Sequence, residues 1–355
     1  MLDIQFIRDN AALVAEKSKQ KGYPVDVKKL LELDEQRRKL LSEVEVLRQK
    51  RNEAAQRTKG KKPTAKDIAS GKKLKDKITL LDEKLAKNEA VFLPLHKAVP
   101  NMPLEDVPIG SSEEESKVVY ERGDKPNFDF QPKNHAELAE QRGWLDKVRA
   151  AKVAGSRFAY IKGDLVKLQT ALITWITDIL TDEKVLELIA TEAKLKDIST
   201  KPFIPILPPL MISTEMFDAM DRLEPRDDRY KIEGEELWLQ GSAEHVIGSM
   251  HSNETLSEEV MPLRYLGFAT SFRKEAGTYG KDMEGLIRMH QFDKLEMESF
   301  THPDDGLKEH LFFLAIQEYI LSQLGLPYHK LLKCTFDIGK PNARGVDMET
   351  WLPGQ

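Results

Sequence analysis

The chain has 355 residues but a single cysteine, Cys334, so an internal disulfide and a zinc site built from cysteines are both excluded. It has no run of about 18 apolar residues, and its first residues lack a basic segment followed by an apolar one. We therefore expect no membrane span and no secretory signal, and we expect a cytoplasmic protein. Neither of the phosphate-loop patterns GxxxxGKS/T and GxGxxG occurs, so any nucleotide must be bound in another way.

The net charge is small, −5, but it is unevenly spread. Between Arg48 and Lys77, twelve Lys and Arg residues stand against three Asp and Glu, a local +9 that leaves −14 to the rest of the chain. Charge of one sign favours contact with nucleic-acid phosphates, and the lack of interleaved aromatics favours a folded RNA over single-stranded bases. A solvated coiled-coil surface is the alternative. The candidate RNA-binding residues are Arg48, Lys50, Arg51, Arg57, Lys59, Lys61, Lys62, Lys66, Lys72 and Lys73.

Apolar residues recur in steps of three and four along residues 27–58 and again along 74–95, the spacing of a narrow coiled-coil seam. The segment between them contains Gly60 and Pro63 and cannot continue a helix. Two helices of one chain joined by a short break predict an antiparallel hairpin with its tip near residues 58–70. We expect the second arm to end before Pro94.

The remainder predicts an α+β fold. Residues 100–133 are rich in Pro, Asp, Glu, Ser and Gly and are typical of a linker. Further on, the pattern predicts a helix over 134–152, a strand over 156–162, an apolar helix over 165–180 and a β-hairpin over 230–239. The expected domains are a helical hairpin domain (1–105), a linker (106–133) and a domain with an antiparallel sheet flanked by helices (134–355).

Two segments, 263–275 and 286–296, alternate with the period of neighbouring strands. In the first segment, Leu266 and Phe272 occupy a face that can be buried. The other face carries small residues and ends with the charged residues Arg273 and Glu275. In the second, alternation puts one aromatic and several charged residues on one face. Antiparallel pairing then gathers five residues on one surface: Arg273, Glu275, Arg288, Phe292 and Glu296.

This set suits a nucleotide and an amino acid. Two guanidinium groups match the oxygens of a polyphosphate, and an aromatic ring between them can stack on a purine. Glu275 can accept from an exocyclic amine, and Glu296 can take an ammonium group. Ser242 and Glu244 follow a strand in a step of two, so we expect them on one side, where they could also hold an α-ammonium group. A sheet face of exposed ion pairs is the alternative.

Residues 272–277 (FRKEAG) and 285–296 (GLIRMHQFDKLE) resemble motif 2 of the class II aminoacyl-tRNA synthetases. Within that class, the residues of the motif closely resemble those of the seryl-tRNA synthetase family. The resemblance covers almost the whole chain, including the start MLDI, VAGSRF at 153–158 and ETWLPGQ at 349–355. It implies a class II antiparallel sheet flanked by helices and a homodimer formed through a first motif near residues 166–209. It also implies activation of L-serine by ATP and transfer to tRNA(Ser), whose long variable arm the hairpin would reach.

The resemblance also implies residue roles. Arg273 and Arg288 would be catalytic, the first at the α-phosphate and the second at the bent triphosphate. For Met289, strand alternation predicts that only its backbone faces the nucleotide. Mg²⁺ is expected as a cofactor, with its ligands beyond residue 355. The implied ATP contacts are Arg273, Lys274, Glu275, Arg288, Met289 and Phe292, and the implied serine contacts are Ser242, Glu244, Arg273 and Glu296.

The sequence departs from the family pattern in three places. The family usually has Thr where Ser242 stands, and a basic residue where Glu284 stands. The printed sequence also stops at Gln355, before the family's metal-binding segment and motif 3, so we expect activity to be intact only in a longer parent chain. Two other functions stay open: a non-catalytic tRNA-binding or regulatory relative, and a ligase that charges a carrier protein with serine.

Overall fold

The computed structural model describes residues 2–58, 64–275 and 285–353. The chain divides into two compact units, Met1–Val119 with Leu331–Asp347 and Tyr120–Lys330 with Met348–Gln355. In the described ranges, none of the helices combines the length and apolarity that crossing a membrane requires.

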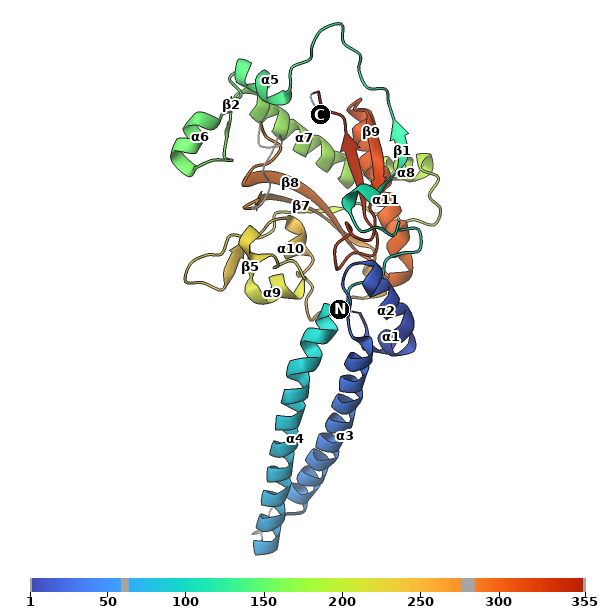
Figure 1. Ribbon diagram of the computed structural model, residues 1–355, viewed down its shortest axis with the longest axis vertical. Helices are drawn as coiled ribbons and strands as arrows, with labels where there is room; N and C mark the ends of the chain where they lie inside the picture. Colours follow the sequence, from blue (N-terminus) through green and yellow to red (C-terminus); the bar gives the residue numbers. More distant parts are fainter. Residues whose placement is uncertain (1, 59–63, 276–284, 354–355) are drawn as a thin grey trace. The chain divides into compact units, whose positions relative to one another are not determined.

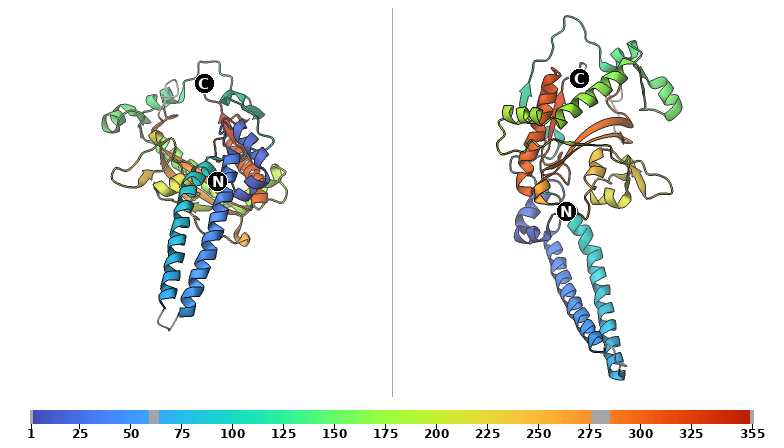
Figure 2. Two further views of the ribbon diagram at one scale, coloured as in Figure 1. Left: turned by 60° about the horizontal axis from the view of Figure 1, so that its bottom comes forward. Right: turned by 180° about the vertical axis from the view of Figure 1, so that it is seen from behind.

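Four helices dominate the first unit: α1 (Ile4–Asp9), α2 (Ala11–Gln20), α3 (Val27–Thr58) and α4 (Ala65–Ala98). Helices α3 and α4 lie side by side as the predicted antiparallel hairpin (Figures 1 and 2). Thr64 begins α4 with a capping box, in which its hydroxyl accepts from the Asp67 N–H and the Asp67 carboxylate accepts from the Thr64 N–H. The predicted turn, residues 59–63, lies outside the described residues.

The seam of the hairpin is mainly apolar but includes polar residues. Val44 and Ile78 are buried on it, as the spacing of three and four requires. Asn88 is also buried, and its side-chain N–H donates to the carbonyl of Leu33 at 3.2 Å. Arg37, another polar residue of the seam, donates to Glu89 at 2.9 Å. Each of these two side chains bonds to the other helix, which favours one register of the two helices, while Asn88 Oδ1 is buried without a hydrogen-bond partner among the described residues.

The prediction that the second arm ends before Pro94 is wrong, because α4 continues through Pro94 to Ala98. The proline removes one backbone hydrogen bond from the helix. Phe92 and Leu95 compensate by packing into an apolar cluster with Ile7 and Leu30. Burial of these side chains keeps the last turns helical where the local rule predicts an end.

The stretch predicted as linker contains regular structure, a 3₁₀ turn (Glu113–Glu115) and strand β1 (Lys117–Arg122). Every residue of β1 is exposed, so no apolar alternation marked it in the sequence. It joins a three-stranded sheet in the order β1–β9–β10, with β9 (Tyr328–Leu332) and β10 (Val346–Thr350). Cys334 is buried in the first unit.

The helix predicted over 134–152 is two helices, α5 (His135–Gln141) and α6 (Lys147–Ala154), because Gly143 has a φ of +65° that a helix cannot contain. Between them, β2 (Leu145–Asp146) pairs antiparallel with β3 (Tyr160–Ile161). The predicted strand over 156–162 is thus only two residues long.

The main sheet of the second unit has the order β4–β7–β8, with β4 (Ile204–Ile206) parallel to β7 (Leu263–Phe272) and β8 (Gln291–Phe300) antiparallel to it (Figure 1). One face packs through Leu266 on α7 (Asp164–Thr181), α8 (Glu183–Glu192) and α11 (Gly306–Gln323). The other face packs through Tyr265 and Ala269 on α10 (Ala243–Ile247). The α+β fold class is confirmed.

A smaller antiparallel pair, β5 (Met211–Ser213) and β6 (Leu237–Leu239), packs with α9 (Thr214–Ala219) around Phe217 and Trp238. The predicted hairpin over 230–239 forms, because Leu239 donates to the Tyr230 carbonyl and Lys231 bridges to Trp238. After β6 the chain runs beside the end of β7, where the Phe272 N–H donates to the Gln240 carbonyl at 2.9 Å.

Candidate functional site

Strands β7 and β8 pair antiparallel, as predicted, and their register decides which side chains share a face. Phe292 lies opposite Ser271, Lys294 opposite Ala269 and Glu296 opposite Gly267. Larger side chains on β8 therefore face small residues on β7. A Cβ at Gly267 would overlap the Ile247 side chain, so glycine is what allows α10 to approach this face.

Arg273 continues the ladder one residue beyond β7, because its N–H donates to the His290 carbonyl at 3.0 Å. Its Nε donates to the Gly241 carbonyl at 3.0 Å, and its guanidinium carbon lies 5.3 Å from the centre of the Phe292 ring. The structure thus brings together the predicted phosphate-binding and purine-stacking groups. Lys274 is exposed, with its ammonium 5.6 Å from the ring of Tyr230.

Arg288 and Glu275 are not on strands, which corrects the alternation assigned to them. β7 ends at Phe272 and β8 begins at Gln291, and Glu275 has a φ of +50°. Even so, an ion pair joins Arg288 Nη1 to Glu275 Oε2 at 3.1 Å. The inference for Met289 also loses its basis, since the residue precedes β8, where its side chain is buried. Glu284 lies outside the described residues.

Ser242 meets Glu296 at the other end of this face. Its hydroxyl donates to a Glu296 carboxylate oxygen and accepts from Lys294 Nζ at 3.1 Å. Lys294 also forms an ion pair with Glu296. A hydroxyl, a carboxylate and an ammonium group therefore form a compact polar cluster, and the carboxylate already binds a cation of the same kind as a substrate α-ammonium.

Glu244 does not share a strand face with Ser242, because α10 begins between them. Ser242 caps this helix, and its Oγ accepts from the Glu244 N–H at 3.3 Å. The Glu244 carboxylate accepts from Arg222 Nε at 2.9 Å. Neighbours on a strand face are two positions apart, and Ser242 and Glu244 are also two positions apart in the helix cap. The sequence alone could therefore not distinguish a shared strand face from a cap.

Three arginines at the site were not predicted from the sequence. Arg157 donates to the Glu275 carbonyl at 2.6 Å, Arg222 binds Glu244, and Arg229 lies over the Phe217 ring at 5.7 Å. All three lie outside strands and helices, so no periodicity marked them. Lys294 was detectable, because it alternates with Phe292 and Glu296.

Burial and these cations together set the charge state of the neighbouring His245. Burial, reinforced by Arg229 and Arg222, lowers the pKa of His245 to about 3. His245 is therefore neutral near pH 7, and its Nδ1 accepts from the Gly241 N–H at 3.3 Å. This histidine shapes the backbone that holds Arg273 and carries no positive charge.

In the ranges that the structure describes, no group of three or more His, Cys, Asp or Glu side chains is arranged to hold a metal ion. The residues present therefore supply no complete protein ligand set for Mg²⁺. The expectation that its ligands lie beyond residue 355 stays a prediction.

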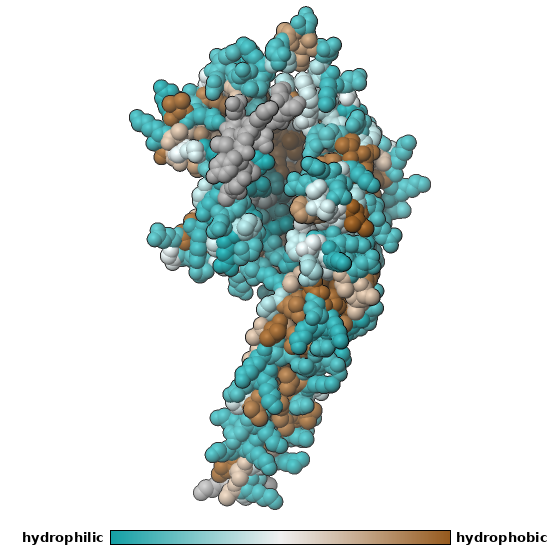
Figure 3. Space-filling model, in the orientation of Figure 1, coloured by the Kyte–Doolittle hydropathy of each residue, from teal (hydrophilic) through white to brown (hydrophobic). Residues whose placement is uncertain are grey.

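The candidate RNA-binding residues of the hairpin that fall in described ranges are all exposed. They are Arg48, Lys50, Arg51, Arg57, Lys66, Lys72 and Lys73. Arg48 contacts Asp82 at 3.1 Å. Figure 3 shows apolar side chains among hydrophilic ones along the hairpin, and a groove there is lined in part by Val46, Leu47 and Leu80. Lys59, Lys61 and Lys62 lie outside the described residues.

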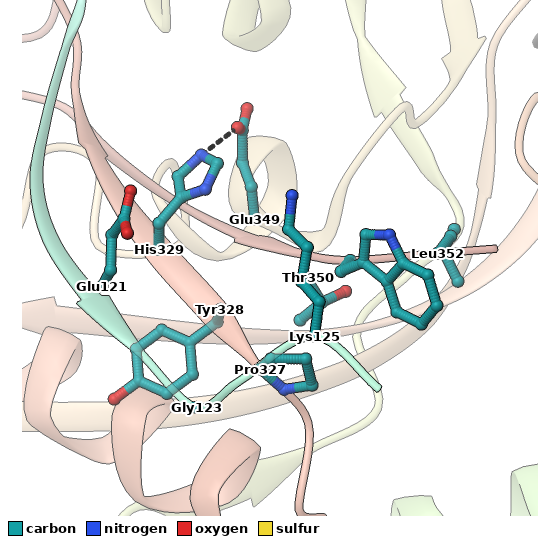
Figure 4. Close-up of a pocket in the computed structure, with 10 residues that line it drawn as sticks. Glu121, Gly123, Lys125, Pro327, Tyr328, His329, Glu349, Thr350 and Leu352 are labelled. Atoms are coloured by element: carbon teal, nitrogen blue, oxygen red, sulfur yellow. Dashed lines mark hydrogen bonds and ion pairs between the residues drawn. The ribbon is translucent and has the colours of Figure 1, made fainter. Parts of the chain in front are cut away.

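A separate pocket of the second unit lies at β9 and β10 (Figure 4). His329 and Glu349 meet there at 2.6 Å, as the dashed line in the figure shows. Tyr328 and Lys125 also line it. None of the predicted site residues does, so this pocket is distinct from the β7–β8 site.

The antiparallel β7–β8 pair carries arginine, phenylalanine and carboxylate groups on one face, the sequence has no phosphate-loop pattern, and the chain belongs to the class II synthetases. Accordingly, residues 229–355 match the family model "tRNA synthetase class II core domain (G, H, P, S and T)", and residues 1–103 match "Seryl-tRNA synthetase N-terminal domain".

Relatives are similar over the whole chain. The serine–tRNA ligase of Syntrophotalea carbinolica is 36% identical over 359 residues, which cover 100% of this chain and 81% of the relative. That of Borreliella burgdorferi is 37% identical, with 100% and 80% covered. The crystal structure of seryl-tRNA synthetase from Pyrococcus horikoshii complexed with ATP is 30% identical, with a TM-score of 0.81 over 100% of this chain and 81% of that one. The Naegleria fowleri cytoplasmic enzyme (TM-score 0.79, 23% identical, 100% and 80% covered) shares the fold.

The chain belongs to the serine–tRNA ligase family.

Proposed function

We propose that the protein activates L-serine with ATP and transfers it to tRNA(Ser). One observation carries the proposal: in a chain of this family, the Arg273–Phe292 stack and the Ser242–Glu296 cluster share one face of the β7–β8 sheet. The first suits a nucleotide and the second an amino acid. Their common face suits a reaction between the two.

For ATP, the proposed contacts are the six residues implied by the resemblance. Phe292 stacks on the adenine, and Glu275 accepts from its exocyclic amine. Arg273 holds the α-phosphate between the ring and the substrate carboxylate. Arg288 leaves its ion pair with Glu275 to hold the outer phosphates, a change of partner that its position beside β8 allows. Lys274 and the backbone of Met289 complete the set.

For serine, Arg273 binds the carboxylate while Glu296 and Ser242 bind the amino acid's polar groups. Glu296 is neutralised by Lys294 in the described structure, so the substrate's α-ammonium competes with an internal cation. Glu244 contributes through its ion pair with Arg222. Binding therefore exchanges one charge pair for another, at little cost in buried charge.

The reaction needs positioning more than proton transfer. The serine carboxylate oxygen attacks the α-phosphorus in line, the bond to the β-phosphate breaks, and pyrophosphate leaves. No general base is required, because the nucleophile is already a carboxylate. Arg273 and Arg288 stabilise the charge that develops on the phosphoryl oxygens. Mg²⁺, when bound, would supply further charge neutralisation on the phosphates.

For tRNA, the basic hairpin is the proposed contact. Its exposed lysines and arginines would bind phosphates of the long variable arm without reading bases, since this segment has no aromatic side chains to stack on them. Deleting residues 48–77 should then abolish transfer to tRNA and leave adenylate formation intact. Survival of both activities would contradict the role given to the hairpin.

A homodimer acting in the cytoplasm is part of the proposal. The family's first motif would lie near residues 166–209, where α7 exposes Val166 and Leu168. Exposed apolar residues on a helix of an enzyme family are consistent with a subunit interface. Sedimentation of the protein would show a dimer, and a monomer at micromolar concentration would contradict this part.

The central test is equilibrium binding of ATP together with serine-dependent exchange of pyrophosphate into ATP. We expect exchange with serine and none with alanine or threonine. Arg288→Ala should weaken ATP binding at least about tenfold, which corresponds to about 1.4 kcal/mol. The matched control is Arg226→Ala, which removes an exposed arginine paired with Glu224 and should change nothing.

The same measurements separate the alternatives. Binding of tRNA without ATP binding would indicate the regulatory relative. Exchange with serine, followed by transfer to a carrier protein and not to tRNA, would indicate the carrier ligase. Equal ATP affinity in both variants would remove the nucleotide site from the β7–β8 face.

A further inference from the structure

Glu298 is an acidic residue of the site face that no role above uses. It follows Lys294 and Glu296 in steps of two along β8, and the register places it opposite Tyr265 of β7. It is partly buried on the face that α10 covers. Its carboxyl group is therefore part of the polar floor next to Glu296.

The charged groups around Glu298 are already matched to one another. On β8, Lys294 forms its ion pair with Glu296. From α10, Glu244 faces it and is bound by Arg222.

The residues opposite Glu298 on the neighbouring strands carry no charge, and the nearby His251 is paired with Glu254. On β7, the Tyr265 hydroxyl is bound to His251 Nε2 at 3.0 Å, and the β4 residue opposite Tyr265 is Ile204. Among the described residues, no ion pair joins Glu298 to a cation. Of the three carboxylates, Glu296 and Glu244 are each paired with a cation in the described structure, and Glu298 is the one that is not.

Electrostatics then determine the state of the third carboxylate. Withdrawal from water, together with the charges of Glu296 and Glu244, raises the pKa of Glu298 to about 8, and Lys294 and Arg222 only partly oppose this. Glu298 therefore carries a proton near pH 7 while the site holds no additional cation. A third cation brought into the cluster would favour the charged form.

We propose that Glu298 is the proton-linked residue of the serine site, and that an α-ammonium group seated at Glu296 displaces the proton that Glu298 holds in the empty site. The O–H bond of Glu298 breaks, the proton passes to solvent, and the carboxylate remains beside the ammonium. Glu298 acts on the substrate through this charge and makes no contact with the reacting phosphate. The inference rests on the proposed function, because it needs serine to bind at Glu296.

The proton exchange gives the site a preference for cationic substrates. When a ligand with an ammonium group binds, Glu298 becomes charged and adds a third negative charge to the cluster. The same molecule without its amine leaves Glu298 neutral. The neutral acid also spares the empty site the repulsion of three adjacent carboxylates.

The test is calorimetric binding of L-serine in buffers of different ionisation enthalpy, between pH 6 and 8. We expect release of a large fraction of one proton at pH 7. The affinity for serine should rise with pH, by at most about tenfold per pH unit, and should level off near pH 8. Serinamide, which keeps the ammonium, should release the proton too. Glycerate, which lacks it, should not.

The variant that decides is Glu298→Gln, which keeps the shape of the neutral acid. It should fold and bind serine without proton release and without the pH dependence. Glu187→Gln, on the exposed surface of α8, is the matched control and should behave as the unaltered protein. Proton release that persists in Glu298→Gln, or serine binding with none in the unaltered protein, would overturn the inference and leave the proposed function standing. Failure of serine to bind would overturn both.

Discussion

The guanidinium group of Arg273 lies over the ring of Phe292, with 5.3 Å between the guanidinium carbon and the ring centre. The two residues come from different strands, and the pairing of Ser271 with Phe292 sets their approach. A bound adenine would have to share this ring, so the cation also limits where a purine can stack.

Arg273→Lys should raise the dissociation constant for ATP by about 10- to 100-fold. A lysine keeps the charge, but it cannot bind the Gly241 carbonyl, the ring and a phosphate with one planar group. Phe292→Ala should have a similar effect, and the double variant should lose less than the sum, with a coupling of about 0.5–1 kcal/mol. Strict additivity in this cycle, measured by calorimetry, would show that the stack has no part in binding.

Ser242→Ala should weaken serine binding about tenfold, because it removes a hydroxyl that bridges Glu296 and Lys294. Ser242→Thr keeps the hydroxyl and restricts its rotamer, so affinity should be equal or higher. ATP binding serves as the internal control and should be unchanged in both variants. Weaker serine binding in the threonine variant than in the alanine variant would contradict the role of the hydroxyl.

Lys72→Glu combined with Lys73→Glu should weaken tRNA binding and reduce its dependence on salt, since each lost phosphate contact removes counterion release. Lys84→Glu with Lys87→Glu gives a matched control on the same helix, where the side chains are equally exposed. Titrations at several salt concentrations check both. Identical salt slopes for the two pairs of variants would argue for a solvated surface and against an RNA contact.

Arg264 and Glu309 form an ion pair inside the second unit, with Arg264 Nε donating to Glu309 at 2.9 Å. Arg264→Met should lower the free energy of unfolding by about 3–5 kcal/mol, because it leaves Glu309 charged and buried. Adding Glu309→Leu should recover part of that loss. The exposed pair Arg226–Glu224 is the control, and breaking it should cost under about 1 kcal/mol. Denaturant unfolding measures all of these.

Lys21 is buried in the first unit, and its ammonium donates to the carbonyls of Asn101, Lys340 and Asn342 at 3.1, 3.0 and 2.7 Å. Lys21→Met should cost about 2–4 kcal/mol of unfolding free energy, because three carbonyls lose their donor. Lys19→Met, at an exposed position of α2, should cost little.

Lys21 should also contribute to the pH dependence of the free energy of unfolding. Burial lowers its pKa to about 8 from an ordinary 10.5, so the unfolded chain binds more protons between these values. Stability from this residue is therefore fully present above pH 10.5 and is lost as pH falls through about 8. Thermal unfolding of the Lys21→Met variant should lack this component, and an unchanged pH profile would contradict the assignment.

Much of the site face could be predicted because strand alternation is a local property. Arg273, Phe292 and Glu296 fall on one face by a period of two, and the register of β7 and β8 keeps them there. The same logic failed for Arg288 and Glu275, which lie beyond the ends of the strands, where the chain no longer alternates. They still pair, because the two strand ends are neighbours in space.

By itself, the sequence determined the two helices of the hairpin, the excess of positive charge near its tip and the side of each strand that carries the chemistry. Periodicity and charge are properties of short stretches, so they can be read without contacts. Only the tertiary structure decided that α4 passes through Pro94, that Glu244 binds Arg222, and that Glu298 lies beside two carboxylates that are already paired with cations. These outcomes depend on groups distant in sequence, whose burial and electrostatic balance exist only once the chain has folded.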